Sequence, residues 1–244
     1  MPADLETLLP FRPRRQRPRI RLVCFPFAGG AASVYRQWGA SLPDHVDVCA
    51  VELPGRGTRF GEPPIHDPAR LKEELALLTA LSDLPVVYFG HSLGARIAFW
   101  LVHGGVRADS VIVSGARAAH LAPSVRSTLP RDAMVQELRR LGGTPREILD
   151  DEEMLDLVLP VVRADFRLLE SLRVSEQDKI QCPLEVLAAT DDAEAPLADA
   201  AKWQVHAGGK HRFTSLEGGH FYVVSRAERV LVEVRRVLDE TLTT

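Results

Sequence analysis

The most regular feature of this sequence is a series of short apolar runs that predict buried strands. Each run is nearly continuous in apolar character and is bounded by glycine, proline or aspartate. Such runs are typical of strands whose two faces are both covered. The predicted strands are residues 20–25, 46–53, 85–89, 110–114, 184–189 and 212–216.

Segments with a helical spacing of apolar residues lie between these strands. A strand, a helix and a further strand in that order form a right-handed crossover, so their alternation predicts an α/β fold. We therefore expect a mainly parallel central sheet that is flanked by helices on both faces. The predicted helices are residues 32–42, 68–81, 93–103, 196–206 and 227–242.

One region, residues 117–174, breaks the alternation because it contains no good strand. Two amphipathic helices are predicted within it, at 132–141 and 151–172, with the breaker sequence Gly-Gly-Thr-Pro between them. Ligands bind at the carboxyl ends of the strands in such sheets. A helical insertion that follows the strand at 110–114 is therefore expected to form a lid over that edge.

Length and composition indicate an ordinary globular protein. The chain has 244 residues, 45% of them hydrophobic and 26% charged, and we expect residues 1–244 to form a single domain. With 30 basic and 33 acidic residues the net charge is -3, which gives no general attraction to nucleic acid or to a membrane surface. The three cysteines lack the spacing of a zinc site or of a disulfide framework.

The start of the chain and its apolar runs bear on its location. Acidic residues precede the arginines near the N-terminus, which is the reverse of a secretory signal. No apolar stretch approaches the roughly 18 residues of a membrane span. We therefore expect a cytoplasmic protein, with a monomer as the default state.

The strongest chemical signal is the sequence Gly-His-Ser-Leu-Gly at residues 90–94. An apolar strand precedes it and a helical run follows it. A strand, Gly-x-Ser-x-Gly and a helix in this order are the context of a nucleophile elbow. This sharp, strained turn lifts the serine hydroxyl above the sheet. We therefore expect Ser92 to be the nucleophile of a hydrolase.

A serine at its ordinary pKa needs a base, and a carboxylate that holds this base in the right tautomer. In enzymes with a nucleophile elbow the chain order is serine, acid, histidine. Of the eight histidines, His220 follows the last predicted strand, and Gly218 and Gly219 let its backbone return over the sheet. His91, beside the nucleophile on a sharp turn, is expected to point away from the hydroxyl.

The acid is expected after the strand at 184–189, where Asp191 and Asp192 are adjacent. Two neighbouring aspartates point in different directions, so one faces the imidazole and the other is a solvated or turn-capping carboxylate. We prefer Asp192 as the acid and keep Asp191 as the alternative.

An oxyanion hole takes one backbone N–H from the residue after the nucleophile and one from a loop after an early strand. Leu93 supplies the first. The second is expected from the sequence Phe-Pro-Phe-Ala-Gly-Gly at 25–30, where the proline has no N–H and the glycines permit close approach of the backbone. We choose Ala28 as this donor, with Phe27 as the alternative.

Taken together, these motifs resemble the type II thioesterases of polyketide and nonribosomal peptide assembly lines, a branch of the α/β-hydrolases. The similarity extends over nearly the whole chain. The pattern PGRGTRFGEPP occurs in far fewer kinds of enzyme than GHSLG alone, so it makes the resemblance more specific. The segments that carry the resemblance are FPFAGGAASVYRQW, ELPGRGTRFGEPP, FGHSLGA, LGGTPREIL and LPVVRADF.

The resemblance implies an α/β-hydrolase fold with a helical lid, and Ser92, Asp192 and His220 as nucleophile, acid and base. It also implies hydrolysis of acyl groups from the phosphopantetheine arm of an acyl or peptidyl carrier protein, through a serine acyl-enzyme and without a metal or organic cofactor. A fatty-acyl thioesterase or a small-ester esterase would share these motifs. An alternative of another class is a non-catalytic module of this fold that binds acyl groups or proteins.

Carrier proteins are generally acidic, so a local basic surface would suit their docking. Arginines are concentrated between residues 12 and 21, and the predicted lid adds Arg126, Arg131, Arg139 and Arg140. Docking of a carrier protein on the lid cluster is a hypothesis that these charges suggest.

The PGRG sequence favours a structural role over direct contact with the substrate. Its proline and glycines predict a tight turn after a strand. Arg56, and Arg59 beyond it, are candidates to pin this turn by hydrogen bonds.

Overall fold

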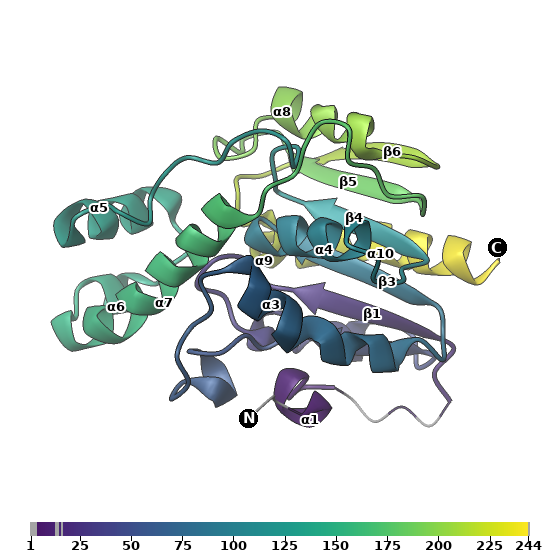
Figure 1. The fold of residues 1–244 in the computed structure, drawn as a ribbon, viewed down its shortest axis with the longest axis horizontal. Coiled ribbons are helices and arrows are strands. Elements are labelled where there is room, and N and C mark those ends of the chain that lie inside the picture. Colours follow the sequence, from purple (N-terminus) through teal and green to yellow (C-terminus); the bar gives the residue numbers. More distant parts are fainter. Residues whose placement is uncertain (1–3, 13–14, 16, 244) are drawn as a thin grey trace.

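The computed structural model describes residues 4–12, 15 and 17–243, and Arg14 of the N-terminal arginine cluster lies outside this part. At its centre is a six-stranded sheet in the order β2-β1-β3-β4-β5-β6, and every neighbouring pair of strands is parallel (Figure 1). The strands are β1 (Ile20–Phe25), β2 (Val46–Ala50), β3 (Val86–His91), β4 (Ser110–Ser114), β5 (Leu184–Ala189) and β6 (His211–Leu216).

Alternate residues of the strands face two separate layers of apolar side chains. In β1, Val23 belongs to a cluster with residues of α4 (Leu93–His103), whereas Cys24 belongs to a cluster with residues of α10 (Ala227–Leu242). Every residue of β1 to β5 is buried. Helices therefore cover both faces of the sheet, which is the predicted α/β arrangement.

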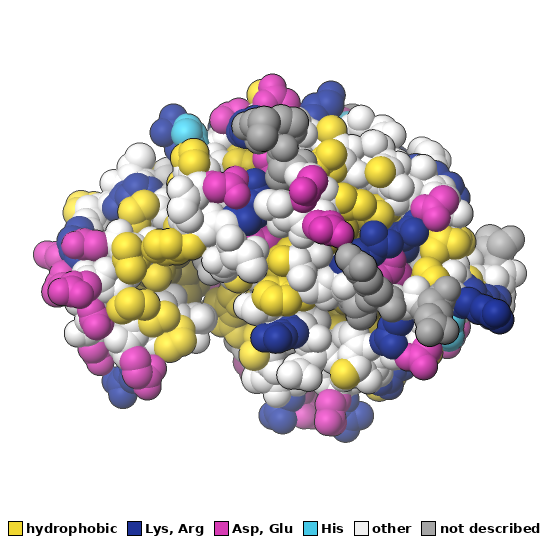
Figure 2. Space-filling view, turned by 90° about the horizontal axis from the view of Figure 1, so that it is seen from below, with side chains coloured by type: hydrophobic (Ala, Val, Ile, Leu, Met, Phe, Trp, Pro, Cys, Tyr) yellow, Lys and Arg dark blue, Asp and Glu magenta, His cyan; other side chains and the backbone are white. Residues whose placement is uncertain are grey.

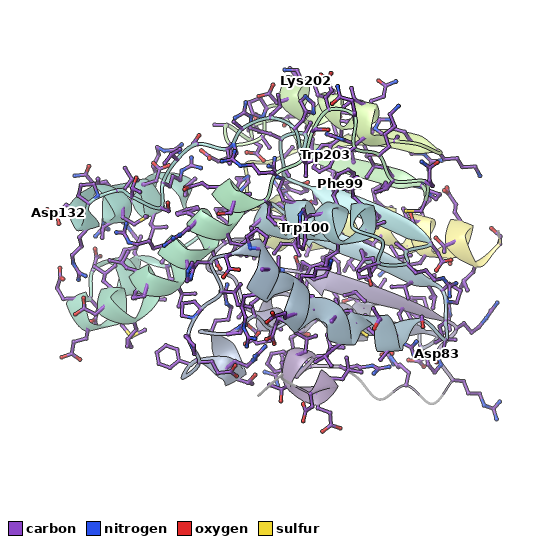
Figure 3. The ribbon with its side chains drawn as sticks, in the orientation of Figure 1. Asp83, Phe99, Trp100, Asp132, Lys202 and Trp203 are labelled. Atoms are coloured by element: carbon purple, nitrogen blue, oxygen red, sulfur yellow. The ribbon has the colours of Figure 1, made fainter. Side chains whose placement is uncertain are left out.

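Aromatic contacts hold α4 in place. Phe99 on this helix lies edge-on to Trp203, with their ring centroids 5.2 Å apart (Figure 3). The indole N–H of Trp203 donates to the carbonyl of Ala116, 2.9 Å away, in the loop after β4. The helix that follows the elbow is thus packed against the segment that leads into the insertion.

Most predicted elements are present with nearly the expected bounds. The strands at 20–25, 110–114 and 184–189 and the helices at 93–103 and 227–242 are confirmed to the residue. Three predicted helices each consist of an α-helical and a 3-10 part: η1 (Ala32–Tyr35) with α2 (Trp38–Ser41), α3 (Pro68–Leu75) with η3 (Ala76–Leu81), and α8 (Leu197–Ala201) with η4 (Lys202–His206). Short elements that the sequence did not predict are α1 (Leu5–Leu8), η2 (Gly57–Arg59), α6 (Arg146–Leu149) and α9 (Tyr222–Ser225).

Between β4 and β5 the chain forms α5 (Arg131–Leu141), α6 and α7 (Glu152–Ser171), which project from one side of the body (Figure 1). The insertion lies beyond the carboxyl ends of the strands, toward which the arrows point. Figure 2 shows hydrophobic side chains on both sides of the hollow between the insertion and the body. The insertion has a small apolar core that contains Met134, Leu138, Leu149, Leu155, Leu159, Val162 and Phe166.

Candidate active site

Ser92 occupies a strained turn between β3 and α4. Its φ of 55° and ψ of -113° make it the one non-glycine residue with a positive φ in the described part of the chain. A Cβ on Gly90 would lie 2.0 Å from the carbonyl oxygen of Gly94, and a Cβ on Gly94 would lie 2.1 Å from that of Phe25. Glycine is therefore required at both positions, and the segment has the geometry of a nucleophile elbow.

The structure brings Ser92, His220 and Asp192 into one hydrogen-bonded series. Ser92 Oγ lies 3.2 Å from Nε2 of His220, and His220 Nδ1 lies 2.9 Å from Oδ2 of Asp192. The three side chains come from the turn after β3, the loop after β6 and the loop after β5, which meet at the carboxyl edge of the sheet. When Nδ1–H donates to the carboxylate, Nε2 directs a lone pair at the hydroxyl, which is the tautomer that a general base needs.

Asp192, and not Asp191, faces the imidazole. Its side chain is buried, and its Oδ1 accepts the backbone N–H groups of Glu194, 2.8 Å away, and Ala195, 3.0 Å away. Burial raises the pKa of this carboxyl, but the hydrogen bonds from His220 and from the two amides outweigh burial and leave the pKa below its ordinary value. Asp191 is exposed to solvent.

His91 is buried against the loop that carries His220. Its Nε2 donates to the main-chain carbonyl of His220, 2.9 Å away, so its Nδ1 accepts from Oγ of Ser114, 3.0 Å away. The hydroxyl of Tyr222 lies 2.6 Å from the same Oγ and donates to the carbonyl of Leu187. Burial lowers the pKa of His91 to about 3, so the ring is neutral at physiological pH. No motif or spacing in the sequence indicates this contact of His91 with the backbone of His220.

We expect His91→Phe to lower kcat by about 10- to 100-fold, because without this hydrogen bond the imidazole of His220 shifts relative to the Ser92 hydroxyl. KM should change little, since His91 is not among the residues that line the chamber beside Ser92. His91→Asn keeps a side-chain N–H and should recover part of the loss. Steady-state kinetics on an acyl-pantetheine thioester, with Tm measured in parallel, tests this positioning role. A raised KM with unchanged kcat would contradict it.

The two backbone N–H donors of an oxyanion hole are expected at Leu93 and in the loop after β1. Leu93 is the first residue of α4, so its N–H has no carbonyl partner within the helix. Ala28 and Phe27 both border the chamber beside the nucleophile. The N–H of Gly29, next in the chain, is already bonded to a carboxylate oxygen of Asp165. The N–H groups of Ala28 and Phe27 therefore remain the candidates for the second donor.

Arg56 of the PGRG sequence connects this loop with the insertion. Its guanidinium contacts both carboxylate oxygens of Asp165 on α7, at 2.6 and 2.8 Å, and both side chains are almost completely buried. One of these oxygens also accepts the N–H of Gly29 at 2.7 Å. Arg56 donates further to the carbonyls of Pro54 and Gly30. The residue pins its own turn, as the structural interpretation of PGRG predicts, and it also fixes α7 against the loop after β1.

We expect Arg56→Met to lower the free energy of unfolding by about 3–5 kcal/mol, because the Asp165 carboxylate is then buried without its cation. The exposed pair of Arg212 with Glu240 provides a matched control, and Arg212→Met should cost less than about 1 kcal/mol. Urea unfolding followed by circular dichroism measures both changes. Equal, small losses in the two variants would show that the buried pair is not needed for stability.

A chamber extends from Ser92 and His220 toward the insertion. Gly143, in the turn between α5 and α6, packs so closely on Phe221 that a Cβ there would lie 2.1 Å from the ring Cζ. The mainly apolar lining is suited to the hydrocarbon part of an acyl group. Its apolar side chains include Phe27 and Phe221 from the body and Leu138, Leu141, Phe166 and Leu169 from the insertion.

The arginines of the insertion are paired with nearby carboxylates. Arg126 and Arg140 both contact Glu137 and Glu194. The other two arginines of the cluster form ion pairs with acidic residues of the segment 150–156. Their positive charges are therefore largely balanced within the protein, which argues against a strongly basic docking surface at this place.

Neither a metal site nor a membrane span is present among the described residues. No group of three or more His, Cys, Asp or Glu side chains among them is arranged to hold a metal ion. Likewise, no helix in residues 4–12 or 17–243 combines the length and the apolar character needed to cross a bilayer.

Comparison with known proteins places the chain in a family. The family model described as "Thioesterase domain" matches residues 20–238. Thioesterase PikA5 of Streptomyces venezuelae is 37% identical over 212 residues, which cover 84% of this chain and 75% of the relative.

Solved structures agree with this assignment. The type II thioesterase BorB from the borrelidin biosynthetic cluster is 33% identical, with a TM-score of 0.80 over 94% of this chain and 96% of that one. YbtT, a type II thioesterase from the yersiniabactin NRPS/PKS pathway, is 28% identical, with a TM-score of 0.83 over 95% and 98%. The α/β-hydrolase fold expected from the motifs is confirmed. By its sequence and by its fold, this chain belongs to the thioesterase family.

Proposed function

We propose that this protein is a type II thioesterase that hydrolyses acyl groups from the phosphopantetheine arm of acyl or peptidyl carrier proteins in polyketide or nonribosomal peptide biosynthesis. The observation that carries the proposal is the series of Ser92, His220 and Asp192 at the mouth of an apolar chamber, in a chain of the thioesterase family. The names of PikA5, BorB and YbtT agree with this activity.

In the first half of the proposed reaction, Ser92 Oγ attacks the thioester carbonyl while His220 Nε2 takes the hydroxyl proton. Asp192 stabilises the imidazolium that forms. The N–H groups of Leu93 and Ala28 donate to the oxyanion, and loss of one such donor costs about 3–4 kcal/mol of transition-state stabilisation. The C–S bond then breaks, the pantetheine thiol leaves with the proton, and the acyl group remains as an ester on Ser92.

In the second half, a water molecule takes the place of the thiol. His220 removes its proton as it attacks the ester, and Ser92 leaves with that proton, so the free acid is released. A thiol is a better leaving group than an amine, so the general-base step, worth about 10²–10⁴-fold, matters more than proton donation to the leaving group. These side chains and amides provide for each proton transfer and each developing charge, and we propose that no metal or organic cofactor takes part.

The insertion has a distinct part in this proposal. Residues 117–174 would act as a lid within a single domain, residues 1–244, because their side chains line the chamber opposite the nucleophile. Ser92, Asp192 and His220 all come from one chain, so a monomer contains the whole site.

A panel of substrates tests the proposed activity. The wild type should hydrolyse acyl-carrier proteins and acyl-pantetheine thioesters with a higher kcat/KM than p-nitrophenyl esters of the same acyl groups. A preference for the oxygen esters would identify a small-ester esterase instead. Fastest release from a fatty-acid carrier loaded with long alkyl chains would identify a fatty-acyl thioesterase.

A further inference from the structure

Four charged side chains form a closed ionic cluster at the rim of the acyl chamber. Arg126 and Arg140, both in the insertion, each contact the same two carboxylates. These belong to Glu137 on α5 and to Glu194 in the loop after β5, and the four N–O distances lie between 2.5 and 2.8 Å. Arg126 and Glu194 also line the chamber. Ion pairs contribute to stability when several charges form such a network.

Glu194 is the member of the cluster that belongs to the body. It lies two residues after Asp192, and its backbone N–H donates to Oδ1 of that residue, 2.8 Å away. Its carboxylate accepts from Nη2 of Arg126 and from Nη2 of Arg140, each at 2.5 Å. Glu194 therefore joins the loop of the proposed catalytic acid to α5 and to the segment that leads into α5.

The remaining contacts of the cluster stay within the insertion. The backbone N–H of Arg126 donates to Glu170 on α7, at 2.7 Å, and α7 is itself fixed to the body through Asp165. Among the ion pairs of the described residues, that of Arg140 with Glu194 is the one that links α5 to the body. Since α5 and α6 form the part of the insertion farthest from the sheet (Figure 1), this link restrains the part that has most freedom to move.

The cluster stays ionised at physiological pH. Hydrogen bonds from Arg140 and Arg126 outweigh burial and lower the pKa of Glu137 to about 2. The side chains of Arg126, Glu137 and Glu194 are at most 18% exposed, so water screens their attraction only in part. The link between α5 and the body is therefore present whenever the protein is at neutral pH.

The chamber is small while the cluster is closed. Its volume is about 110 Å³, which is less than the roughly 150 Å³ of a cavity that binds benzene. Leu138 and Leu141 of α5 form part of its lining. An acyl group of more than a few carbons therefore needs α5 to move outward, and this movement breaks the contacts with Glu194.

We propose that Glu194 is a specificity residue that limits the size of the acyl group by holding α5 against the body. A small acyl group fits without any movement, whereas a bulky one is hydrolysed only after the two ion pairs of Glu194 have broken. The free-energy cost of opening then affects bulky acyl groups alone. This inference rests on the proposed thioesterase function, since it assigns the size limit of the same site.

The test compares the pantetheine thioesters of propionate and octanoate. Glu194→Gln keeps the shape of the side chain and the backbone N–H that bonds Asp192, but it removes the charge that both arginines contact. In this variant kcat/KM for octanoyl should rise by about 3- to 10-fold, because the ion pairs no longer oppose opening. The value for propionyl should stay within about 2-fold of the wild type. Glu194→Asp keeps the charge on a shorter side chain and should give an intermediate ratio.

Salt provides a second readout, which a merely structural role of Glu194 would not change. Raising the NaCl concentration from about 0.1 M to about 1 M shortens the Debye length from about 10 to about 3 Å and weakens partly exposed ion pairs. The octanoyl-to-propionyl ratio of the wild type should therefore rise toward that of Glu194→Gln, whose own ratio should change less. Effects of salt on burial of the alkyl chain are common to both proteins, so the comparison removes them.

Glu73→Gln provides the control, since it makes the same chemical change in the exposed ion pair with Arg70 on α3. Its ratio and its salt dependence should equal those of the wild type. Equal losses for both thioesters in Glu194→Gln would show that Glu194 only supports the loop of Asp192, and would overturn the proposal. An unchanged ratio in that variant would overturn it as well.

Two outcomes need no variant. A wild type that hydrolyses octanoyl at least as well as propionyl would overturn the size limit. Hydrolysis of the p-nitrophenyl esters of the two acids, but of neither thioester, would instead refute the thioesterase function. The octanoate-to-propionate ratio measured with those esters would then still test the restraint by Glu194, because the same chamber holds the acyl group.

Discussion

Ser92→Ala is expected to lower kcat for acyl-carrier hydrolysis by about 10⁴- to 10⁶-fold, the largest loss of any single substitution in this chain. The variant keeps the base, the acid and the oxyanion donors, but no covalent acyl-enzyme can form. Intact-mass analysis of an acylated carrier protein should show rapid loss of the acyl group with the wild type and none with the variant on the same timescale.

A fluorophosphonate probe separates this outcome from a non-catalytic acyl-binding protein. The wild type should be labelled once, and Ser92→Ala should not be labelled. Ser41→Ala removes an exposed hydroxyl that bonds the carbonyl of Gln37, and it should behave as the wild type in both assays. Labelling of Ser92→Ala, or no labelling of the wild type, would contradict the assignment of the nucleophile.

Asp192→Asn is expected to lower kcat by about 10⁴-fold, whereas Asp191→Asn should change it by less than about 3-fold. The amide of asparagine can donate to His220 Nδ1, which favours the tautomer with the proton on Nε2 and removes the lone pair that faces Ser92. The adjacent positions make the two variants a matched pair with the same chemical change. The reverse pattern would assign the acid to Asp191.

The same variant also has a predicted effect on stability. Because the pKa of Asp192 is lowered in the folded protein, its ionisation stabilises the fold above the ordinary aspartate pKa, and this contribution is lost as the pH falls through the folded value. As the pH falls below about 4, the free energy of unfolding should therefore decrease less in Asp192→Asn than in the wild type. Urea unfolding at several pH values measures the difference.

The sheet was predictable because its strands are buried on both faces and alternate with helices. The predicted strand at 46–53 shows the limit of that reasoning. Val51 and Leu53 are buried, but β2 ends at Ala50, and the N–H of Glu52 bonds the carbonyl of Leu8 in α1. An apolar run reports burial and does not distinguish a strand from an extended segment that packs beside the sheet. Similarly, helical spacing does not resolve where an α-helix tightens to a 3-10 helix.

Some residues of the candidate site were predictable from the sequence and others were not. Ser92 could be located from a local motif, and Asp192 and His220 from the order of strands and loops. The partners of His91 and Arg56 lie far away in the sequence, as in the pair of Arg56 with a carboxylate 109 residues later. Such contacts depend on how separate loops meet at the edge of the sheet. The spacing of apolar residues along the chain carries no information about these contacts.

The contact of Asp165 with both Gly29 and Arg56 restricts how the chamber can widen for a bulky acyl group. If α7 swung outward, it would pull on the loop that is proposed to supply an oxyanion donor, and the catalytic geometry would be lost. Expansion must therefore come from α5 and α6, which are joined at Gly142 and Gly143. It follows that exchanging residues 131–149 between thioesterases of this family should transfer the range of accepted acyl sizes while the turnover of small acyl groups stays intact.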